Sequence, residues 1–228
     1  MNKIHEIYNK KVNVYSKYVN PYIVKYVKPN KTILDIGCAS GELGNYLRRN
    51  LNAKVYGVDI SNIAIKNAKR KLDEAVVCNI ETDKLPFQKK FFDIIICGDV
   101  LEHLFNPEGT LEKLQQYLKP DGYMILSVPN IANIEIRWNL LWGKFDYTES
   151  GILDNGHIRF FTKQTLLNMI KECQLRVINT EYTPGFSFFF LKLKAVQKFP
   201  ILLKLKEFLN KIVPTLTCTQ FILIVKKI

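Results

Sequence analysis

Short apolar runs alternate with segments in which apolar residues recur every three or four positions along most of the chain. The apolar runs predict buried β-strands, and the three-to-four periodicity predicts amphipathic helices. Such an alternation is typical of a mainly parallel sheet that is covered by helices. The expected strands are residues 32–36, 54–59, 75–78, 92–97, 123–128, 175–183 and 220–226, the last of them as an edge strand.

Helices are expected between these strands, together with two insertions. The predicted helices are residues 5–27, 41–50, 62–72, 107–118 and 163–172, and a turn is predicted at 119–122. The alternation breaks at residues 129–161, which are rich in Asn, Gly, Trp and Tyr, and again at residues 184–214. Because the sequence has no repeat, low-complexity tract or Gly/Ser linker, we expect one domain over residues 1–228.

Charge and cysteine content narrow the class of protein. The formal net charge is +12, and a basic surface attracts nucleic acid, anionic lipid or acidic substrates. No apolar run approaches the roughly 20 residues of a membrane-spanning helix, and the first residues lack the apolar core of a signal peptide. The five cysteines form no CxxC pair, which favours reduced thiols. We therefore expect a cytoplasmic protein.

A glycine-rich turn joins the first expected strand to the helix that follows it. Gly37 and Gly41 let the backbone bend sharply and approach a ligand, and the helix presents free N–H groups there. Asp59 closes the second strand, where an acid can accept both ribose hydroxyls and would repel a 2′-phosphate. The glycine spacing differs from the G-x-G-x-x-G of dinucleotide sites. An acid at Asp35 suits the positively charged tail of S-adenosylmethionine.

Two further segments complete the expected cofactor pocket. Asn79 and Ile80 follow the third strand, where an amide can bond the adenine amino group and an apolar side chain can cover the ring. The fourth strand ends in Gly98 and Asp99, beside the place of the transferable methyl group. These four segments occur in the order and spacing of the class I S-adenosylmethionine-dependent methyltransferases. The sequence resembles that family over about residues 31–128, which includes the family's Leu-Lys-Pro-Asp-Gly turn at residues 118–122.

The resemblance implies a Rossmann-like α/β fold whose seven-stranded sheet is mostly parallel, with an antiparallel last strand and helices on both faces. It implies S-adenosyl-L-methionine as the methyl donor and S-adenosyl-L-homocysteine as the product. Ala39 replaces the middle glycine of the commonest D-x-G-x-G-x-G pattern, and Asn79 stands where Asp is usual. The implied cofactor contacts are Asp35, Gly37, Cys38, Gly41, Asp59, Ile60, Asn79, Ile80, Gly98 and Asp99.

His103 is one candidate for the acceptor side of the site. Methyl transfer is an in-line displacement, which is helped by aligning donor and acceptor and by a base that takes the acceptor's proton. His103 ends the stretch Asp99-x-x-Glu102–His103. This stretch resembles the metal-binding E-x-x-E-H of ubiquinone-pathway O-methyltransferases, with Asp for the first Glu. It is also similar to D-x-x-E-H in relatives without a metal, where the pair packs under the sheet or caps a helix. We expect no metal here, because ligand spacing alone is weak evidence.

His157 is the preferred candidate for the general base, with Asp154 or Asp146 as the residue that orients it. Residues 151–161 resemble the GILDxTHxRFFT stretch of a methyltransferase subgroup that is often encoded with sugar and cell-envelope glycan genes. This insertion follows the fifth strand, where it can fold over the mouth of the active site. The alternative is that His157 and Arg159 fix the insertion by hydrogen bonds.

The second insertion is expected to carry a helix from Pro200 to near Pro214, with lysines on one side and apolar residues on the other. A covering helix is favoured, and a membrane-surface contact, a lid and a dimer contact are alternatives. The oligomeric state is not indicated.

The function expected from these features is O-methylation of a small molecule, a sugar, or a glycan- or lipid-linked precursor. A nucleic-acid methyltransferase is the alternative that the charge suggests, although the D/N-P-P-Y/F/W sequence of amino-methylating DNA enzymes is absent after the fourth strand. A non-catalytic cofactor-binding module is a further alternative. The glycine spacing disfavours an NAD-dependent oxidoreductase.

Overall fold

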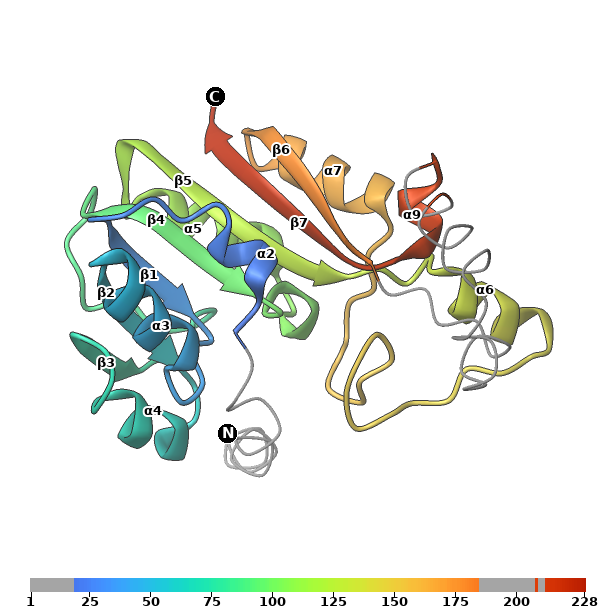
Figure 1. Ribbon diagram of the computed structural model, residues 1–228, viewed down its shortest axis with the longest axis horizontal. Coiled ribbons are helices and arrows are strands. Elements are labelled where there is room, and N and C mark those ends of the chain that lie inside the picture. Colours follow the sequence, from blue (N-terminus) through green and yellow to red (C-terminus); the bar gives the residue numbers. More distant parts are fainter. Residues whose placement is uncertain (1–18, 185–207, 209–211) are drawn as a thin grey trace.

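The computed structural model describes residues 19–184, 208 and 212–228 (Figure 1). The strands are β1 (Thr32–Ile36), β2 (Lys54–Asp59), β3 (Glu74–Val77), β4 (Phe92–Gly98), β5 (Leu118–Pro129), β6 (Leu175–Pro184) and β7 (Cys218–Lys227). The helices are α2 (Pro21–Val24), α3 (Glu42–Leu51), α4 (Asn62–Ala68), the 3-10 helix η1 (Leu101–His103), α5 (Pro107–Gln115), α6 (Ile134–Leu141), α7 (Lys163–Glu172) and α9 (Pro214–Thr217).

The seven strands form one sheet in the order β3-β2-β1-β4-β5-β7-β6. The strands β1 to β5 pair in parallel, and β7 is antiparallel to both β5 and β6. This arrangement confirms the expected fold class. The prediction that residues 220–226 form an edge strand is wrong, because β7 lies between β5 and β6. Its residues 221–225 are all buried, as the continuous apolar run of a covered inner strand requires.

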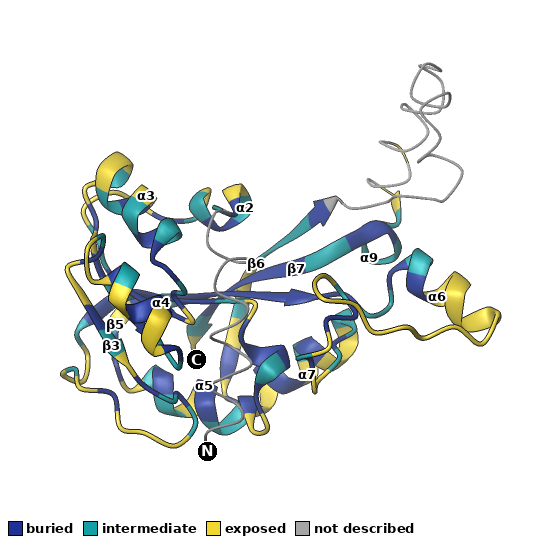
Figure 2. Cartoon of the chain, turned by 90° about the horizontal axis from the view of Figure 1, so that it is seen from below, coloured by how far each residue is buried: buried dark blue, intermediate teal, exposed yellow. Residues whose placement is uncertain are grey.

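Side chains alternate between two apolar layers along each strand, because successive residues of a strand point to opposite faces. In β1, Ile33 packs in the layer formed with α2, α3 and α4, whereas the next residue, Leu34, packs in the layer formed with α5 and α7. Figure 2 shows the sheet edge-on, with α2 and α3 on one side and α5 and α7 on the other, each turning buried residues toward the strands. The expected covering of both faces is thereby confirmed.

Local capping explains where several helices begin. Ser61 precedes α4 and accepts a hydrogen bond from the Ala64 N–H, and Asn106 precedes α5 in the same way. Thr162 precedes α7 and forms a reciprocal capping box with Thr165. These side chains satisfy backbone donors that a helix leaves unpaired in its first turn. The prediction of a helix at residues 163–172 is confirmed at both ends.

Two local predictions are wrong. One continuous helix over residues 5–27 is not formed: residues 19 and 20 are not helical, and α2 begins at Pro21, with Asn20 as its cap, and ends at Val24. Residues 5–18 lie outside the described residues. The expected turn at 119–122 belongs to β5. Leu118 pairs with Phe92 and Tyr123 with Ile94, so this polar segment bulges out of a strand that continues on both sides.

The first insertion folds back against the end of the sheet, and it contains α6. Asn130 at its start and Phe161 at its end form a β-bridge, and the Asn130 carboxamide donates to the Thr215 and Cys218 carbonyls. The α6 helix is largely exposed (Figure 2). The second insertion, with its expected helix from Pro200, lies almost wholly outside the described residues.

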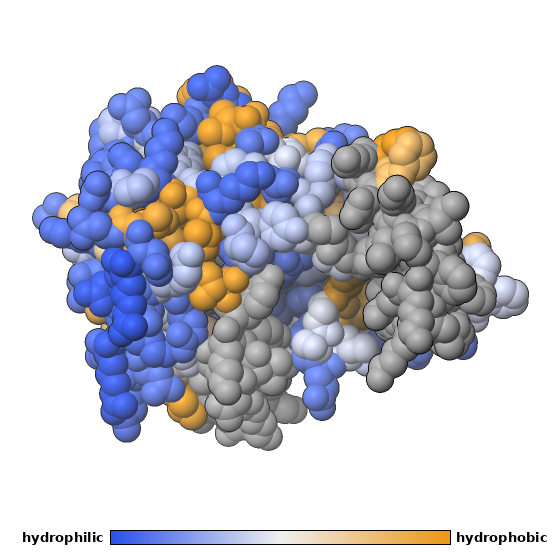
Figure 3. All heavy atoms as spheres, in the orientation of Figure 1, coloured by the Kyte–Doolittle hydropathy of each residue, from blue (hydrophilic) through white to orange (hydrophobic). Residues whose placement is uncertain are grey.

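The surface in the orientation of Figure 1 is mainly hydrophilic over the side formed by α3, α4 and β3, with smaller hydrophobic areas between the polar groups (Figure 3). Among the residues that the structure describes, no helix has the length and apolar character needed to cross a membrane. All five cysteines are buried free thiols, as expected from their spacing. The expected cytoplasmic location stays a prediction.

We predict that Gly44→Ala destabilises the protein, although alanine usually stabilises a helix relative to glycine. A Cβ at Gly44 would lie 2.8 Å from Val55 Cγ1 and would also collide with the Leu72 side chain. Overpacking of this kind costs about 1–3 kcal/mol, which urea unfolding of the variant would measure. Arg49→Ala, at an exposed position of the same helix, is the control and should unfold like the unsubstituted chain. Equal or higher stability of Gly44→Ala would contradict the close contact between α3 and β2.

Candidate active site

A cavity of about 520 Å³ opens at the carboxyl ends of β1, β2, β3 and β4. Ligands of open α/β sheets bind at these strand ends. The wall also includes Ser40, Val100, His103, Leu104 and Phe105. The predicted cofactor residues on the wall are Asp35, Gly37, Cys38, Asp59, Ile60, Asn79, Ile80, Gly98 and Asp99, which are all of those predicted except Gly41.

The turn after β1 brings backbone close to this cavity. Gly37 has φ +67°, and a Cβ there would lie 2.7 Å from Val100 Cγ2, so only glycine fits. Ala39, in place of the usual glycine, also has a positive φ of 44°, and its N–H donates to Asp59 at 2.9 Å. Gly41 caps α3 with φ +79° and packs on Ala68, so it shapes the turn without lining the cavity.

Two carboxyl groups, those of the buried Asp35 and the half-buried Asp59, lie on the cavity wall beside this turn. Burial, and secondly the charge of Asp59, raise the pKa of Asp35 to about 7. Burial likewise raises the pKa of Asp59, while hydrogen bonds from backbone N–H groups, including those of Ser61 and Ala39, oppose the rise. Ionised carboxylates in such a place favour a ligand with positive charge and hydroxyl groups.

Ser40 supplies a further polar group at this wall. Its hydroxyl is buried and has no hydrogen-bond partner, although buried polar atoms are nearly always paired in folded proteins. The site therefore contains two carboxylates with raised pKa values and one unpaired hydroxyl beside a close backbone approach. These groups fit the ammonium and ribose hydroxyls of S-adenosylmethionine.

The loop after β3 carries Asn79 and Ile80, and hydrogen bonds within the loop and from α5 fix its shape. The Asn79 carboxamide oxygen accepts from the Glu81 N–H at 3.0 Å, so that side chain also shapes the loop. The Lys113 ammonium group on α5 donates to the Ile80 carbonyl and, at 3.0 Å, to the Asp83 carbonyl. The sequence-based reasoning missed Lys113, because nothing in its local pattern links α5 to this loop.

Asp99 is fixed in an uncommon conformation at the end of β4. Its φ is +56°, a region that non-glycine residues enter at some cost and often at functional sites. Its Oδ1 accepts from Gln220 Nε2 at 2.7 Å and from Ser127 Oγ at 3.2 Å. Although the residue as a whole is exposed, loss of hydration around its carboxyl group raises the pKa of Asp99 to about 6, against the effect of these two hydrogen bonds. Ser127 and Gln220 were not predicted as site residues, since they come from β5 and β7.

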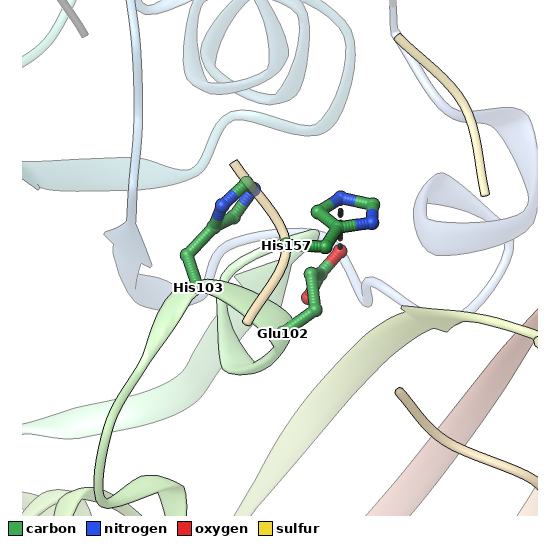
Figure 4. A group of neighbouring side chains, drawn as sticks. All are labelled: Glu102, His103 and His157. Atoms are coloured by element: carbon green, nitrogen blue, oxygen red, sulfur yellow. Dashed lines mark ion pairs between the residues drawn. The ribbon is translucent and has the colours of Figure 1, made fainter. Parts of the chain in front are cut away.

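Glu102, His103 and His157 gather beside the cavity (Figure 4). Glu102 and His103 belong to η1, which directly follows β4, whereas His157 comes from the first insertion. The two imidazole rings lie 4.8 Å apart, centroid to centroid, in an edge-to-face arrangement. His157 Nε2 is 3.9 Å from Glu102 Oε1, which is too long for a hydrogen bond.

The backbone ties the insertion to η1 at this point. The N–H groups of Ile158 and Arg159 both donate to the Glu102 carbonyl, at 2.9 and 3.0 Å. The Asp154 carboxylate accepts from the Gly156 N–H at 2.6 Å. The orienting role of Asp154 toward His157 stays a prediction. Of the three predicted catalytic residues, only His103 lies on the described wall of the cavity.

Glu102 is 1% exposed, and neither of its carboxyl oxygens has a hydrogen-bond partner. Burial, and next the charge of Asp99, raise its pKa well above the ordinary value. An unsatisfied acid this deeply buried is costly, and such groups concentrate at functional sites. The D-x-x-E-H stretch identified Glu102 as a candidate residue from the sequence. That its carboxyl oxygens lack hydrogen-bond partners could be seen only in the structure.

The model of a family described as "Methyltransferase domain" matches residues 8–180. The chain belongs to this methyltransferase family. The expected enzyme class, a class I methyltransferase that uses S-adenosylmethionine, is confirmed at the level of the family. The finer assignment to a glycan-associated O-methyltransferase subgroup is not.

Curated relatives match parts of the chain. The mitochondrial ubiquinone biosynthesis O-methyltransferase of Schizosaccharomyces pombe is 38% identical over 106 residues, which cover 42% of this chain and 37% of that protein. An uncharacterized protein of Methanocaldococcus jannaschii is 36% identical over 155 residues, which cover 62% of this chain and 58% of that protein. The chain thus spans less than two thirds of the length of these relatives.

Solved structures share the fold at low sequence identity. An S-adenosylmethionine-dependent methyltransferase from Archaeoglobus fulgidus has a TM-score of 0.62 at 20% identity, covering 98% of this chain and 94% of that one. A TehB-like methyltransferase from Corynebacterium glutamicum has a TM-score of 0.59 at 18% identity, covering all of both chains. At this identity the likeness shows the fold alone.

We predict that the affinity for S-adenosylmethionine rises with pH through the titration of Asp35. Its pKa of about 7 lies above the ordinary 3.8, so the carboxylate that attracts the ammonium group is lost as the pH falls through 7. Calorimetric titration at pH 6 and pH 7.5 should give a Kd that is roughly five- to tenfold lower at the higher pH. Asp35→Asn should bind weakly and without this dependence, whereas Asp121→Asn, an exposed position, should keep it. A constant Kd for the unsubstituted chain would contradict the assignment.

Proposed function

We propose that the protein transfers the methyl group of S-adenosylmethionine to a hydroxyl oxygen of a small molecule. Two curated relatives, from Schizosaccharomyces pombe and Acinetobacter baylyi, are named as ubiquinone biosynthesis O-methyltransferases, which supports oxygen as the methylated atom. The cavity wall near His103 carries the apolar side chains of Val100, Leu104 and Phe105. A wall of this kind suits an acceptor with an apolar body, so phenols are the first class of acceptor to test.

The cofactor supplies an electrophilic methyl group on its sulfonium. The chain's own contribution is to hold the donor at the strand ends and to place the acceptor oxygen in line with that group. Asp35 and Asp59 favour the charged tail and the ribose hydroxyls, and the bend at Gly37 permits close approach. The rigid end of β4, with Asp99 held by Gln220 and Ser127, fixes the wall on the acceptor side.

The observation that carries the acceptor assignment is the place of His103. It lies on the cavity wall beside Gly98 and Asp99, and its Nδ1 is 2.9 Å from the Gly156 carbonyl oxygen. Because a carbonyl oxygen can only accept, Nδ1 carries the proton and Nε2 keeps its lone pair. In this tautomer His103 Nε2 can accept the proton of the acceptor hydroxyl. The His157 ring lies 4.8 Å from the His103 ring, and neither His157 nor Asp154 is among the residues of the cavity wall.

The proposal is tested by incubating the purified protein with S-adenosylmethionine and separate panels of phenols, sugars, glycan and lipid precursors, and RNA. Release of S-adenosylhomocysteine and mass spectrometry of the product would identify the methylated atom. The expected result is turnover on a small hydroxylated acceptor with methyl on oxygen. Methylation of nucleic acid alone, or cofactor binding without turnover on any panel, would overturn the proposal.

We predict that His103→Asn lowers kcat by about a hundredfold or more on the best acceptor, the usual scale when a group acting on the transferred proton is lost. The Kd for S-adenosylmethionine should stay within about threefold, since the cofactor is held by the β1 and β2 ends. Steady-state kinetics and calorimetry measure the two quantities. His5→Asn, which removes the histidine remote from the site in sequence, is the control. A parallel loss of cofactor affinity would place His103 in the cofactor site instead.

A further inference from the structure

The cavity wall is rich in carboxyl groups. Among its described residues there is no lysine and no arginine, whereas the acids are Asp35, Glu42, Asp59, Glu81 and Asp99. The ammonium group and the sulfonium of S-adenosylmethionine suit such a wall, but the tail of this cofactor also carries a carboxylate. A carboxylate that leaves water needs hydrogen-bond donors in the protein. Neutral groups must therefore supply them here.

The order of the strands indicates which end of the cavity receives that tail. Ile80, expected at the adenine ring, follows β3, and Asp59, expected at the ribose, closes β2. The next strands in the sheet are β1 and then β4. Ile36 of β1 pairs with Cys97 of β4, so these two strands end at the same level. The tail therefore extends toward the ends of β1 and β4.

The short helix α2 lies against this end of the cavity. A Cβ on Gly98, the last residue of β4, would lie 3.2 Å from Ile23 Cδ1, so α2 packs directly on the strand end. Ile23 and Asn20, the N-cap of α2, both line the cavity. Asn20 is only 6% exposed. A buried polar side chain thus lies at the end of the cavity that the cofactor's carboxylate approaches.

The two ends of the Asn20 carboxamide have different hydrogen-bonding states. Its Oδ1 accepts from the Tyr22 N–H at 3.0 Å, and a backbone N–H can bond only to the oxygen end of an amide. The NH₂ group, which has two donor hydrogens, is not bonded to any acceptor among the residues that the structure describes. This group is therefore available to a ligand.

Most backbone donors of the neighbouring turn are already used. The N–H groups of Gly37 and Cys38 both donate to the Val58 carbonyl, at 2.8 and 3.1 Å. The Ala39 N–H donates to Asp59. The N–H groups in the first turn of α3, which have no partner within a helix, are the alternative donors for the cofactor's carboxylate.

We propose that the Asn20 NH₂ group donates a hydrogen bond to the carboxylate of S-adenosylmethionine, so that Asn20 selects the amino-acid tail of the cofactor. A neutral donor suits this wall, because a lysine or arginine would pair with Asp35 or Asp99 and would repel the ammonium group and the sulfonium. The inference rests on the cofactor that the family uses, and it is independent of the acceptor proposed above.

The test compares ligands that differ only in the tail. S-adenosylhomocysteine has the whole tail, its decarboxylated analogue 5′-(3-aminopropylthio)-5′-deoxyadenosine lacks only the carboxylate, and 5′-methylthioadenosine lacks both charged groups. Each is titrated into the full chain by calorimetry. Asn20→Ser should bind S-adenosylhomocysteine at least about tenfold more weakly, the scale of a hydrogen bond to a charged group, while the Kd of the other two ligands stays within about twofold.

The choice of serine separates a ligand contact from a structural role. Serine is as good an N-cap as asparagine, so Asn20→Ser should keep α2, which urea unfolding would verify. Asn106→Ser is the matched control, because Asn106 caps α5 in the same way and is not among the residues of the cavity wall. It should bind all three ligands like the unsubstituted chain.

Asn20→Asp is a second variant that also keeps the cap. It replaces the NH₂ donor by a carboxyl oxygen, so it should bind S-adenosylhomocysteine more weakly than Asn20→Ser does. Its affinity for the decarboxylated analogue, which is a cation, should be equal to or higher than that of the unsubstituted chain. Tight binding of S-adenosylhomocysteine by Asn20→Asp would overturn the proposal.

Two other outcomes would also overturn it. Equal losses for all three ligands in Asn20→Ser would mean that Asn20 only supports α2. Unchanged affinity for S-adenosylhomocysteine in that variant would assign the carboxylate to the N–H groups of α3. Both outcomes leave the proposed function intact. Failure of the unsubstituted chain to bind S-adenosylhomocysteine would instead overturn the proposed function together with this inference.

Discussion

Burial of carboxyl groups at one edge of the sheet is the constraint on which the site depends. Asp35 and Glu102 are buried, Asp59 is half-buried and Asp99 is exposed as a whole residue; all four lie at or just after the ends of parallel strands. Loss of hydration around the carboxyl group is the main cause of the raised pKa of each. A folded chain keeps such groups only when something compensates for their lost hydration. Backbone N–H groups do so for Asp59, and side chains from β5 and β7 do so for Asp99. Glu102 has no hydrogen-bond partner for either carboxyl oxygen, and Asp35 lines the cavity, where a positively charged ligand group could compensate for its lost hydration.

The two halves of the site differ in how they are built. The half that faces the methyl donor is built from segments that are close in sequence. β1, the turn that follows it and β2 bring Asp35, Gly37 and Asp59 together. The acceptor half is assembled from distant segments, since η1 is fixed by backbone bonds to the first insertion and β4 by a side chain of β7. A methyltransferase fold can therefore keep its donor half while the acceptor half varies with the insertion.

This difference explains what could be predicted from the sequence. The first strands and the helix at 163–172 follow from local periodicity, and the resemblance gave cofactor residues that lie on the cavity wall in all cases but Gly41. The place of β7 could not be predicted in this way, because an apolar run does not say which neighbours it pairs with. Gln220 and Lys113 were missed for the same reason: each acts on a loop or strand end far away in sequence. The turn at 119–122 was misassigned since proline and glycine indicate a break, whereas a bulge lets the strand continue around them.

The position of β7 between β5 and β6 imposes an order on the assembly of the protein. β6 pairs with β7, and β7 in turn pairs with β5, so β6 cannot join the growing sheet until the later strand has been inserted beside it. Pairing over such long stretches of chain is slow to form. Because Gln220 arrives with β7, the hydrogen bond that fixes Asp99 forms in this late step. The hydrogen bond that fixes Asp99 at the acceptor wall therefore depends on the pairing of β7 with β5.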